Sequence, residues 1–177
     1  FQMQAMMNIE VMNTYNVKRI VTTCPHSYNT IKNEYKGLGG NYEVLHHTEF
    51  IDELINNGKL SINGNLKGKR ITYHDPCYLG RANEVFDIPR KLINRLGVEL
   101  VEMRRSKRRS FCCGAGGSQM FKEPEKGQQD ININRTEEAL KTKAEVIATG
   151  CPFCNTMMTD GVKNLAEGSV EVLDIAE

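Results

Sequence analysis

The sequence lacks several features that would define whole classes of protein. Its 177 residues carry 23 Lys and Arg against 22 Asp and Glu, so no field of one sign exists to attract nucleic acid or an anionic membrane. It has no apolar run of about 18 residues, so we expect no direct membrane span. The opening FQMQAMMNIE has neither the basic start nor the apolar core of a secretion signal, and it lacks an initiator Met. We therefore expect a fragment of a longer chain.

Cysteine is present, but too sparsely for a disulfide scaffold. There are six cysteines, whereas such scaffolds usually exceed roughly 8–10% Cys. A chain of this length can bury a core without disulfide bonds. Because it has no secretion signal, the expected location is the cytoplasm. Cysteines in that setting are more often metal ligands or redox groups than structural disulfides.

Apolar periodicity predicts alternating strands and helices. The predicted strands are VKRIVTT (17–23), KRITYH (69–74), VELVEM (98–103), AEVIATG (144–150) and VEVLDI (170–175). The predicted helices are TEFIDELINN (48–57), with Thr48 as its cap, IPRKLINRLG (88–97), INRTEEALKTK (133–143) and NTMMTDGVKNL (155–165). This alternation predicts an α/β, Rossmann-like fold with a mostly parallel sheet and helices on both faces.

The chain also contains a tandem duplication. RIVTTCPHSYNT (19–30) aligns with VIATGCPFCNT (146–156), and YEVLHHTE (42–49) aligns with VEVLDIAE (170–177). The offsets agree, at 127 and 128 residues. We infer that residues 1–60 are the back half of a first, incomplete copy and that residues 61–177 are a complete second copy. NNGKLSINGNLKGK (56–69) is predicted to be a turn-rich linker between them.

Five cysteines follow predicted strands of the second copy, namely Cys77, Cys112, Cys113, Cys151 and Cys154. The carboxyl ends of parallel strands share one edge of a sheet, and ligands bind at that edge. These cysteines should therefore meet, although they are far apart in the sequence. The convergence predicts a thiolate site.

The local chemistry suits a soft metal. CPFC opens a predicted helix, whose N-terminal N–H groups stabilise thiolates, and GAGG lets backbone amides approach a ligand closely. Thiolates bind both iron–sulfur clusters and zinc, so ligand type alone does not name the metal. A third interpretation, thioredoxin-like exchange at CPFC, would require only Cys151 and Cys154.

Three motifs resemble one family: HDPCYLGR (74–81), FCCGAGG (111–117) and CPFCNTM (151–157). Together they are similar to the CCG, or cysteine-rich, domain of the heterodisulfide reductase B/D-like and glycolate oxidase iron–sulfur subunits. The chain resembles the C-terminal part of a two-CCG iron–sulfur oxidoreductase. The resemblance implies a non-cubane [4Fe-4S] cluster held by Cys77, Cys112, Cys113, Cys151 and Cys154, which aerobic purification could strip.

The resemblance also implies a function and partners. Family members either cleave a disulfide or heterodisulfide between two facing clusters or relay electrons. Closest in character are those that work beside electron-transfer flavoprotein. The expected partner is therefore a flavoprotein subunit or electron-transfer flavoprotein, with a membrane cytochrome or an oxidoreductase domain as a further option. The expected location is the cytoplasm. A partner or a missing N-terminal region could hold the chain at the cytoplasmic face of the membrane. The sequence has no G-x-G-x-x-G fingerprint of its own for a flavin or nicotinamide.

The first copy departs from the family pattern. It reads Cys24-Pro25-His26-Ser27 where the family has CPxC, and its CC pair lies outside the chain. Serine is a poor ligand for a soft metal. Cys24 therefore marks a degenerate first site, and the competing interpretation of the whole chain is a structural zinc-thiolate domain without redox activity.

Some neighbouring residues suggest supporting roles. His74 and Asp75 either orient the Cys77 loop, hydrogen-bond a cluster sulfur, or serve only the local turn. His46 and His47 could replace missing ligands beside Cys24, but supporting or structural roles are expected, because the second copy has Asp174 and Ile175 at these positions. The basic run RRSKRR (104–109) is expected to be a solvated loop, in which Arg108 or Arg109 is a candidate to offset the charge of a cluster or to dock an acidic partner.

Overall fold

A computed structural model describes residues 1–62, 66–123 and 127–177. All described strand pairs are parallel, as predicted. The first copy forms a two-stranded sheet from β1 (Arg19–Thr22) and β2 (Glu43–His46). The second copy forms a four-stranded sheet in the order β4-β3-β5-β6. Its strands are β3 (Arg70–His74), β4 (Glu99–Leu100), β5 (Val146–Thr149) and β6 (Glu171–Asp174).

The two copies pair their equivalent strands in the same way. Arg19 lies opposite Glu43 in the β1–β2 pair, and Val146 lies opposite Glu171 in the β5–β6 pair. These partners are related by the offsets seen in the sequence. The division into residues 1–60 and 61–177 agrees with this pattern and stays a prediction. Residues 63–65 of the predicted linker lie outside the described residues.

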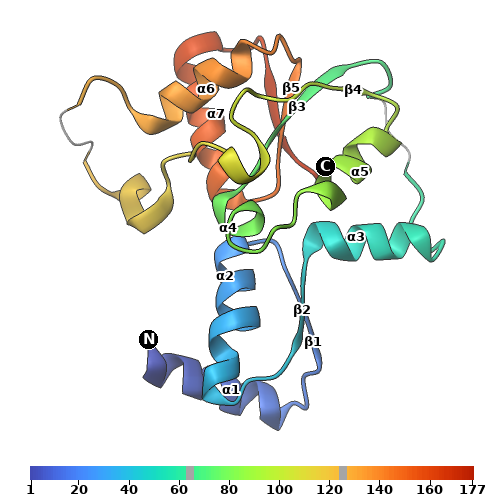
Figure 1. The fold of residues 1–177 in the computed structure, drawn as a ribbon, viewed down its shortest axis with the longest axis vertical. Coiled ribbons are helices and arrows are strands. Elements are labelled where there is room, and N and C mark those ends of the chain that lie inside the picture. Colours follow the sequence, from blue (N-terminus) through green and yellow to red (C-terminus); the bar gives the residue numbers. More distant parts are fainter. Residues whose placement is uncertain (63–65, 124–126) are drawn as a thin grey trace.

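Helices cover both faces of the larger sheet (Figure 1). On one face, α6 (Ile131–Leu140) and α7 (Pro152–Ala166) pack on Ile147 through Ala139, Met158 and Val162. On the other face, Ile93 of α5 (Asp87–Arg95) packs on Ile71, Val146 and Ala148. Successive residues of β5 thus point to opposite faces, and all four are buried. The predicted Rossmann-like α/β fold is confirmed.

Gly161 allows α6 and α7 to cross closely where they cover the sheet. A Cβ atom on Gly161 of α7 would lie 2.9 Å from the Cβ of Thr136 and 3.3 Å from the Asn132 carbonyl oxygen, both on α6. Any larger side chain would therefore push α6 and α7 apart. The close crossing sets the position of α6 relative to the start of α7.

The remaining helices belong mainly to the first copy and to the contact between the copies. Near the middle of Figure 1, α2 meets α4 and α3 meets α5. These and the other short elements are α1 (Gln2–Thr14), α2 (Pro25–Asn29), the π-helix η1 (Thr30–Glu34), α3 (His47–Asn56), α4 (Cys77–Gly80), and the 3-10 turns η2 (Tyr35–Leu38), η3 (Lys107–Arg109) and η4 (Gly116–Phe121).

Besides small shifts at the ends of elements, two differences from the sequence expectations concern how the chain leaves a sheet. The strand predicted over 98–103 has only two residues, because the chain leaves the edge of the sheet after Leu100. Helix α3 is capped by His46 rather than by Thr48, and the carboxylate of Glu49 accepts the His46 backbone N–H at 2.9 Å. His46 ends a strand, so the helix starts directly from the sheet without the intervening residue that a Thr48 cap would need.

Candidate metal centre

The five cysteines gather where the order of the larger sheet reverses. The chain runs outward from β3 to β4, returns across β3 to β5, and continues to β6. The crevice between β3 and β5 is therefore the switch point at which open α/β sheets bind ligands. Cys77 begins α4 just after β3, and Cys151 caps α7 just after β5, with Cys154 in its first turn. The predicted convergence of these strand ends is present.

Cys112 and Cys113 lie on a loop whose conformation requires glycine at position 114. Gly114 has a φ of +95°, and a Cβ atom there would lie 3.2 Å from the Cβ of Ile131. Its backbone N–H donates to the Cys112 Sγ at 3.3 Å. The glycine thus turns an amide toward sulfur while the loop packs against the start of α6. This contact explains the glycine that directly follows the CC pair.

The five thiols are free and form a continuous series of sulfur neighbours. Cys112 interacts with both Cys77 and Cys113, Cys113 interacts with Cys154, and Cys154 interacts with Cys151. Cys113, Cys151 and Cys154 are buried, whereas Cys77 and Cys112 are partly exposed. The cluster is therefore closed on the side of α7 and open at Cys77 and Cys112.

The close approach of the thiols favours the thiolate form of two of these sulfurs. Interaction with the Cys113 and Cys77 thiols lowers the pKa of Cys112 far below that of an ordinary thiol. Interaction with the Cys154 thiol lowers the pKa of Cys151 to about 7, helped by backbone N–H groups of Phe153 and Cys154. The same interactions raise the pKa of Cys113 to about 12, and they also raise the pKa values of Cys77 and Cys154.

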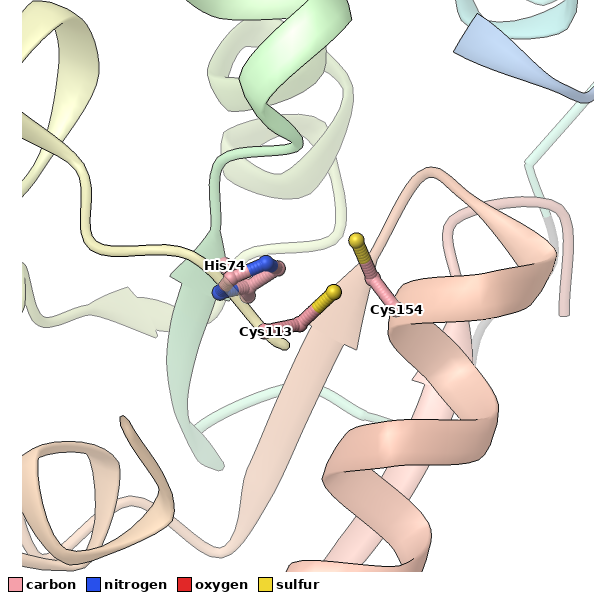
Figure 2. Close-up of side chains that lie close together, drawn as sticks. All are labelled: His74, Cys113 and Cys154. Carbon is pink, nitrogen blue, oxygen red and sulfur yellow. The ribbon is translucent and has the colours of Figure 1, made fainter. Parts of the chain in front are cut away.

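The donor set fits a thiolate-ligated metal group. Five sulfurs from three separate loops converge without a disulfide, and a backbone amide is directed at one of them. A mononuclear zinc site needs four ligands, so the fifth sulfur favours a multinuclear centre. One ligand atom each from His74, Cys113 and Cys154 also lies within 4.8 Å of the others (Figure 2).

His74 is bound by Arg135, a residue that no sequence motif predicts. The Nδ1 atom of His74 accepts a hydrogen bond from the Nε of Arg135 at 3.0 Å, and both side chains are buried. Burial, together with the nearby Arg135 charge, lowers the pKa of His74 to about 3. Arg135 lies on α6 among polar residues, and no local pattern in the sequence distinguishes it from a solvent-facing arginine.

Asp75 orients the loops around the site. Its carboxylate accepts two hydrogen bonds from Arg90, at 2.8 and 2.9 Å, and a third from the Lys107 backbone N–H at 2.8 Å. Asp75 therefore ties the Cys77 loop to α5 and to the segment that precedes the CC pair. This contact set favours the loop-orienting role over donation to sulfur, because an ionised carboxylate has no proton to donate.

The basic run pairs with carboxylates outside the thiol cluster. Arg108 forms an ion pair with Glu84, and Arg105 pairs with Glu138 while stacking over the Phe111 ring at 3.8 Å. Glu84 is thus the direct partner of Arg108, and a role for Arg108 in offsetting a cluster charge stays a prediction. Arg105 instead braces the segment that leads into Cys112.

The first copy reaches the rim of this site through His26. The His26 ring lies 4.6 Å from that of Tyr78 and 5.8 Å from that of Phe153, which neighbour Cys77 and Cys154 in the sequence. Burial opposes ionisation of Cys24, but a contact with His26 Nδ1 at 3.8 Å and backbone N–H groups lower its pKa. Cys24 thus lies in a separate thiol–imidazole pair, beside Ser27.

The two histidines at the junction of β2 and α3 both have polar partners. His46 is fully buried and its Nδ1 lies 2.8 Å from the Thr48 hydroxyl. His47 Nε2 lies 2.8 Å from an Asp174 carboxylate oxygen at the end of β6. The His47–Asp174 contact therefore joins the strand ends of the two copies.

Comparison with known proteins identifies the family. Residues 71–159, half of the chain, match the cysteine-rich domain family called CCG. The chain belongs to this family, and the match contains all five cysteines of the cluster. The resemblance inferred from the three motifs is confirmed.

Several named relatives are similar to the whole chain or nearly so. It is 45% identical to EtfAB:quinone oxidoreductase of Syntrophomonas wolfei, over all of this chain and 26% of that protein. It is 49% identical to the probable iron-sulfur-binding oxidoreductase FadF of Bacillus subtilis, over all of this chain and 25% of that protein. It is 34% identical to one subunit of the dihydromethanophenazine:CoB–CoM heterodisulfide reductase of Methanosarcina barkeri, over 96% of this chain and 42% of that protein.

The chain therefore spans about a quarter of the first two relatives. Within the described ranges, none of its helices combines the length and apolarity needed to cross a bilayer.

Proposed function

We propose that this chain is the cluster-binding segment of an iron–sulfur oxidoreductase. Cys77, Cys112, Cys113, Cys151 and Cys154 would hold a single [4Fe-4S] cluster, which when bound would accept and release one electron at a time. The observation that carries the proposal is the continuous series of five free thiols at the switch point of the sheet. Two similar proteins support it by their names, since one is called an oxidoreductase and the other an iron-sulfur-binding oxidoreductase.

The electron path would lead from a flavoprotein partner to a second acceptor. Support comes from a relative named for both EtfAB and quinone. The open side of the cluster, at Cys77 and Cys112, is the side on which a partner could approach the centre. A cytoplasmic location at the membrane face would bring such a partner and a quinone acceptor together. The chain's own residues would bind the centre, exclude water on the α7 side and set its electrostatics.

Cleavage of a disulfide between two facing clusters is not part of the proposal. Ser27 stands where the family pattern has the second cysteine of CPxC, and Cys24 pairs with His26. Two alternatives remain as outcomes of the test. A structural zinc site would use four of the five thiols, and thioredoxin-like exchange would use only Cys151 and Cys154.

The test is to measure iron, acid-labile sulfide and zinc in anaerobically purified protein, before and after reconstitution. The decisive variant is Cys113→Ser, which removes the buried sulfur between Cys112 and Cys154. The matched control is Cys24→Ser, which removes the one cysteine outside the cluster. We expect about four iron and four sulfide per chain in the wild type and in Cys24→Ser, and a large loss of both in Cys113→Ser.

Other results would reject the proposal in distinct ways. About one zinc per chain with no iron after reconstitution would indicate the structural zinc site. Unchanged redox activity in Cys113→Ser, with activity lost in Cys151→Ser, would indicate exchange at CPFC. Equal iron loss in Cys24→Ser and Cys113→Ser would mean that the first copy contributes a ligand.

A further inference from the structure

Arg135 is fully buried behind the thiol cluster, where an arginine is costly unless it is paired. Its NH1 group donates to the Glu138 carboxylate at 3.0 Å and to the Arg105 carbonyl oxygen at 3.0 Å, while its Nε donates to His74. Glu138 is shared with the Arg105 guanidinium. Arg135 and Arg105 thus share the Glu138 carboxylate, and Asp75 contributes a second negative charge near Arg135.

The bond from Arg135 fixes which nitrogen of His74 carries the proton. A guanidinium has five N–H donors and no acceptor, and it stays protonated in proteins. Nδ1 of His74 must therefore offer its lone pair to Arg135, because an N–H there would meet another N–H. The neutral ring then carries its single proton on Nε2.

The other side of the ring faces sulfur. Figure 2 shows one ring nitrogen of His74 turned toward the sulfurs of Cys113 and Cys154, and the other turned away. Since Nδ1 is engaged by Arg135, the nitrogen on the sulfur side is Nε2. A His that binds a metal shows the reverse arrangement, in which the outer nitrogen donates to a carboxylate or carbonyl and the inner one has a free lone pair. On its sulfur side His74 therefore offers an N–H rather than a free lone pair.

We propose that Arg135 is a positioning residue that holds His74 as an Nε2–H donor to a sulfur of the centre and thereby raises its reduction potential. An N–H directed at sulfur stabilises the more negative, reduced state, so hydrogen bonds to sulfur are one of the protein's controls on the potential. The part that concerns potential rests on the proposed function, whereas the ring tautomer does not.

The first experiment reads the tautomer in cluster-free protein. ¹⁵N NMR of the histidine-labelled chain distinguishes an Nε2–H ring from an Nδ1–H ring, and the His74→Phe variant assigns the signal among the four histidines. We expect His74 to be Nε2–H in the wild type, to remain so in Arg135→Lys, which keeps a donor-only side chain, and to lose this fixed state in Arg135→Leu. An Nδ1–H ring in the wild type would overturn the inference, whether or not a cluster assembles.

The second experiment measures the potential of the reconstituted centre by redox titration followed by EPR. We expect more negative potentials in Arg135→Leu and His74→Phe, and a smaller change in Arg135→Lys. In the His74→Phe background, Arg135→Leu should add little, because its main route of action is already gone. Additive shifts in the double variant would show that Arg135 acts by charge alone and would overturn the positioning role.

Arg108→Leu is the charge control. Arg108 is a cation that pairs with Glu84 outside the thiol cluster, and no hydrogen bond joins it to His74 among the described residues. An equal shift of potential in Arg108→Leu would overturn the inference, because loss of any positive charge near the CC loop would then suffice. If iron and sulfide analysis finds no cluster in any form, the proposed function fails, and the NMR result alone decides the orientation of His74.

Discussion

The two copies place the same cysteine at the same point of the fold, but among the described residues only the second copy gathers further thiols around it. Cys24 and Cys151 both follow a parallel strand, both cap a helix, and both precede a proline at its first position. In the second copy four more thiols surround this position, whereas in the first copy Cys24 faces His26 and Ser27. Strand and cap therefore prepare a thiolate, and the surrounding residues decide whether it becomes part of a metal site.

The most severe change would give the second copy the serine of the first. Cys154→Ser removes a buried sulfur that interacts with both Cys113 and Cys151. We expect bound iron to fall by at least about tenfold, since even second-layer changes at metal sites cost about 10–100-fold in affinity. Metal analysis after reconstitution measures this effect, with circular dichroism to confirm that the variant is folded. Retention of wild-type iron by folded Cys154→Ser would mean that Cys154 is not a ligand.

A large loss of stability is expected where α6 and α7 cross. Gly161→Ala would bring a Cβ to 2.9 Å from that of Thr136, and relieving this overlap should cost about 1–3 kcal/mol in the free energy of unfolding. The matched control is Gly37→Ala in the first copy, where a new Cβ would meet nothing within 4 Å. Urea denaturation compares the two variants. A Gly161→Ala protein as stable as Gly37→Ala would show that the helices can separate at little cost.

An intermediate effect is expected at the contact between the copies. His47 and Asp174 lie 2.8 Å apart, and Asp174→Asn should cost about 1 kcal/mol of stability near neutral pH, a typical value for one hydrogen bond. Burial opposes ionisation of Asp174, but the bond to His47 outweighs it and lowers its pKa below 3.8. The stabilisation is therefore present above about pH 4 and is lost as the pH falls through the lowered pKa.

Denaturation of the wild type and Asp174→Asn between neutral and strongly acidic pH measures this dependence. The difference between them should be largest near neutrality and should disappear in strong acid. A difference that grows as the pH falls would contradict the assigned direction of the pKa shift.

The smallest effect is expected from repairing the first copy in isolation. Ser27→Cys restores the CPxC pattern, but the first copy then offers only two thiols, that of Cys24 and the new one at position 27, without a CC pair in the described chain. Because a thiolate-bound cluster or structural zinc needs about four ligands, we expect no increase in iron or zinc per chain. Metal analysis beside the wild type tests this. A second equivalent of metal would show that the first site is only one residue short of function.

Much of the fold could be predicted because the apolar pattern of each strand is local. The sequence pattern locates the strands that end at His74 and Thr149, and with them the edge at which the cysteines meet. It does not predict the early end of β4 or the His46 cap, since both depend on where the chain leaves the sheet. Arg135 has no local signal either, because its contact with His74 spans 61 residues.

The uneven burial of the five thiols has a consequence for handling the protein in air. Cys112 combines a strongly lowered pKa with partial exposure, and its neighbour Cys77 is also partly exposed. A thiolate that solvent can reach is the form that oxidants attack. The route by which a redox partner would approach is thus also the route for dioxygen and peroxide. A docked partner would close that route, so the isolated chain should be most vulnerable to oxidative damage at Cys112.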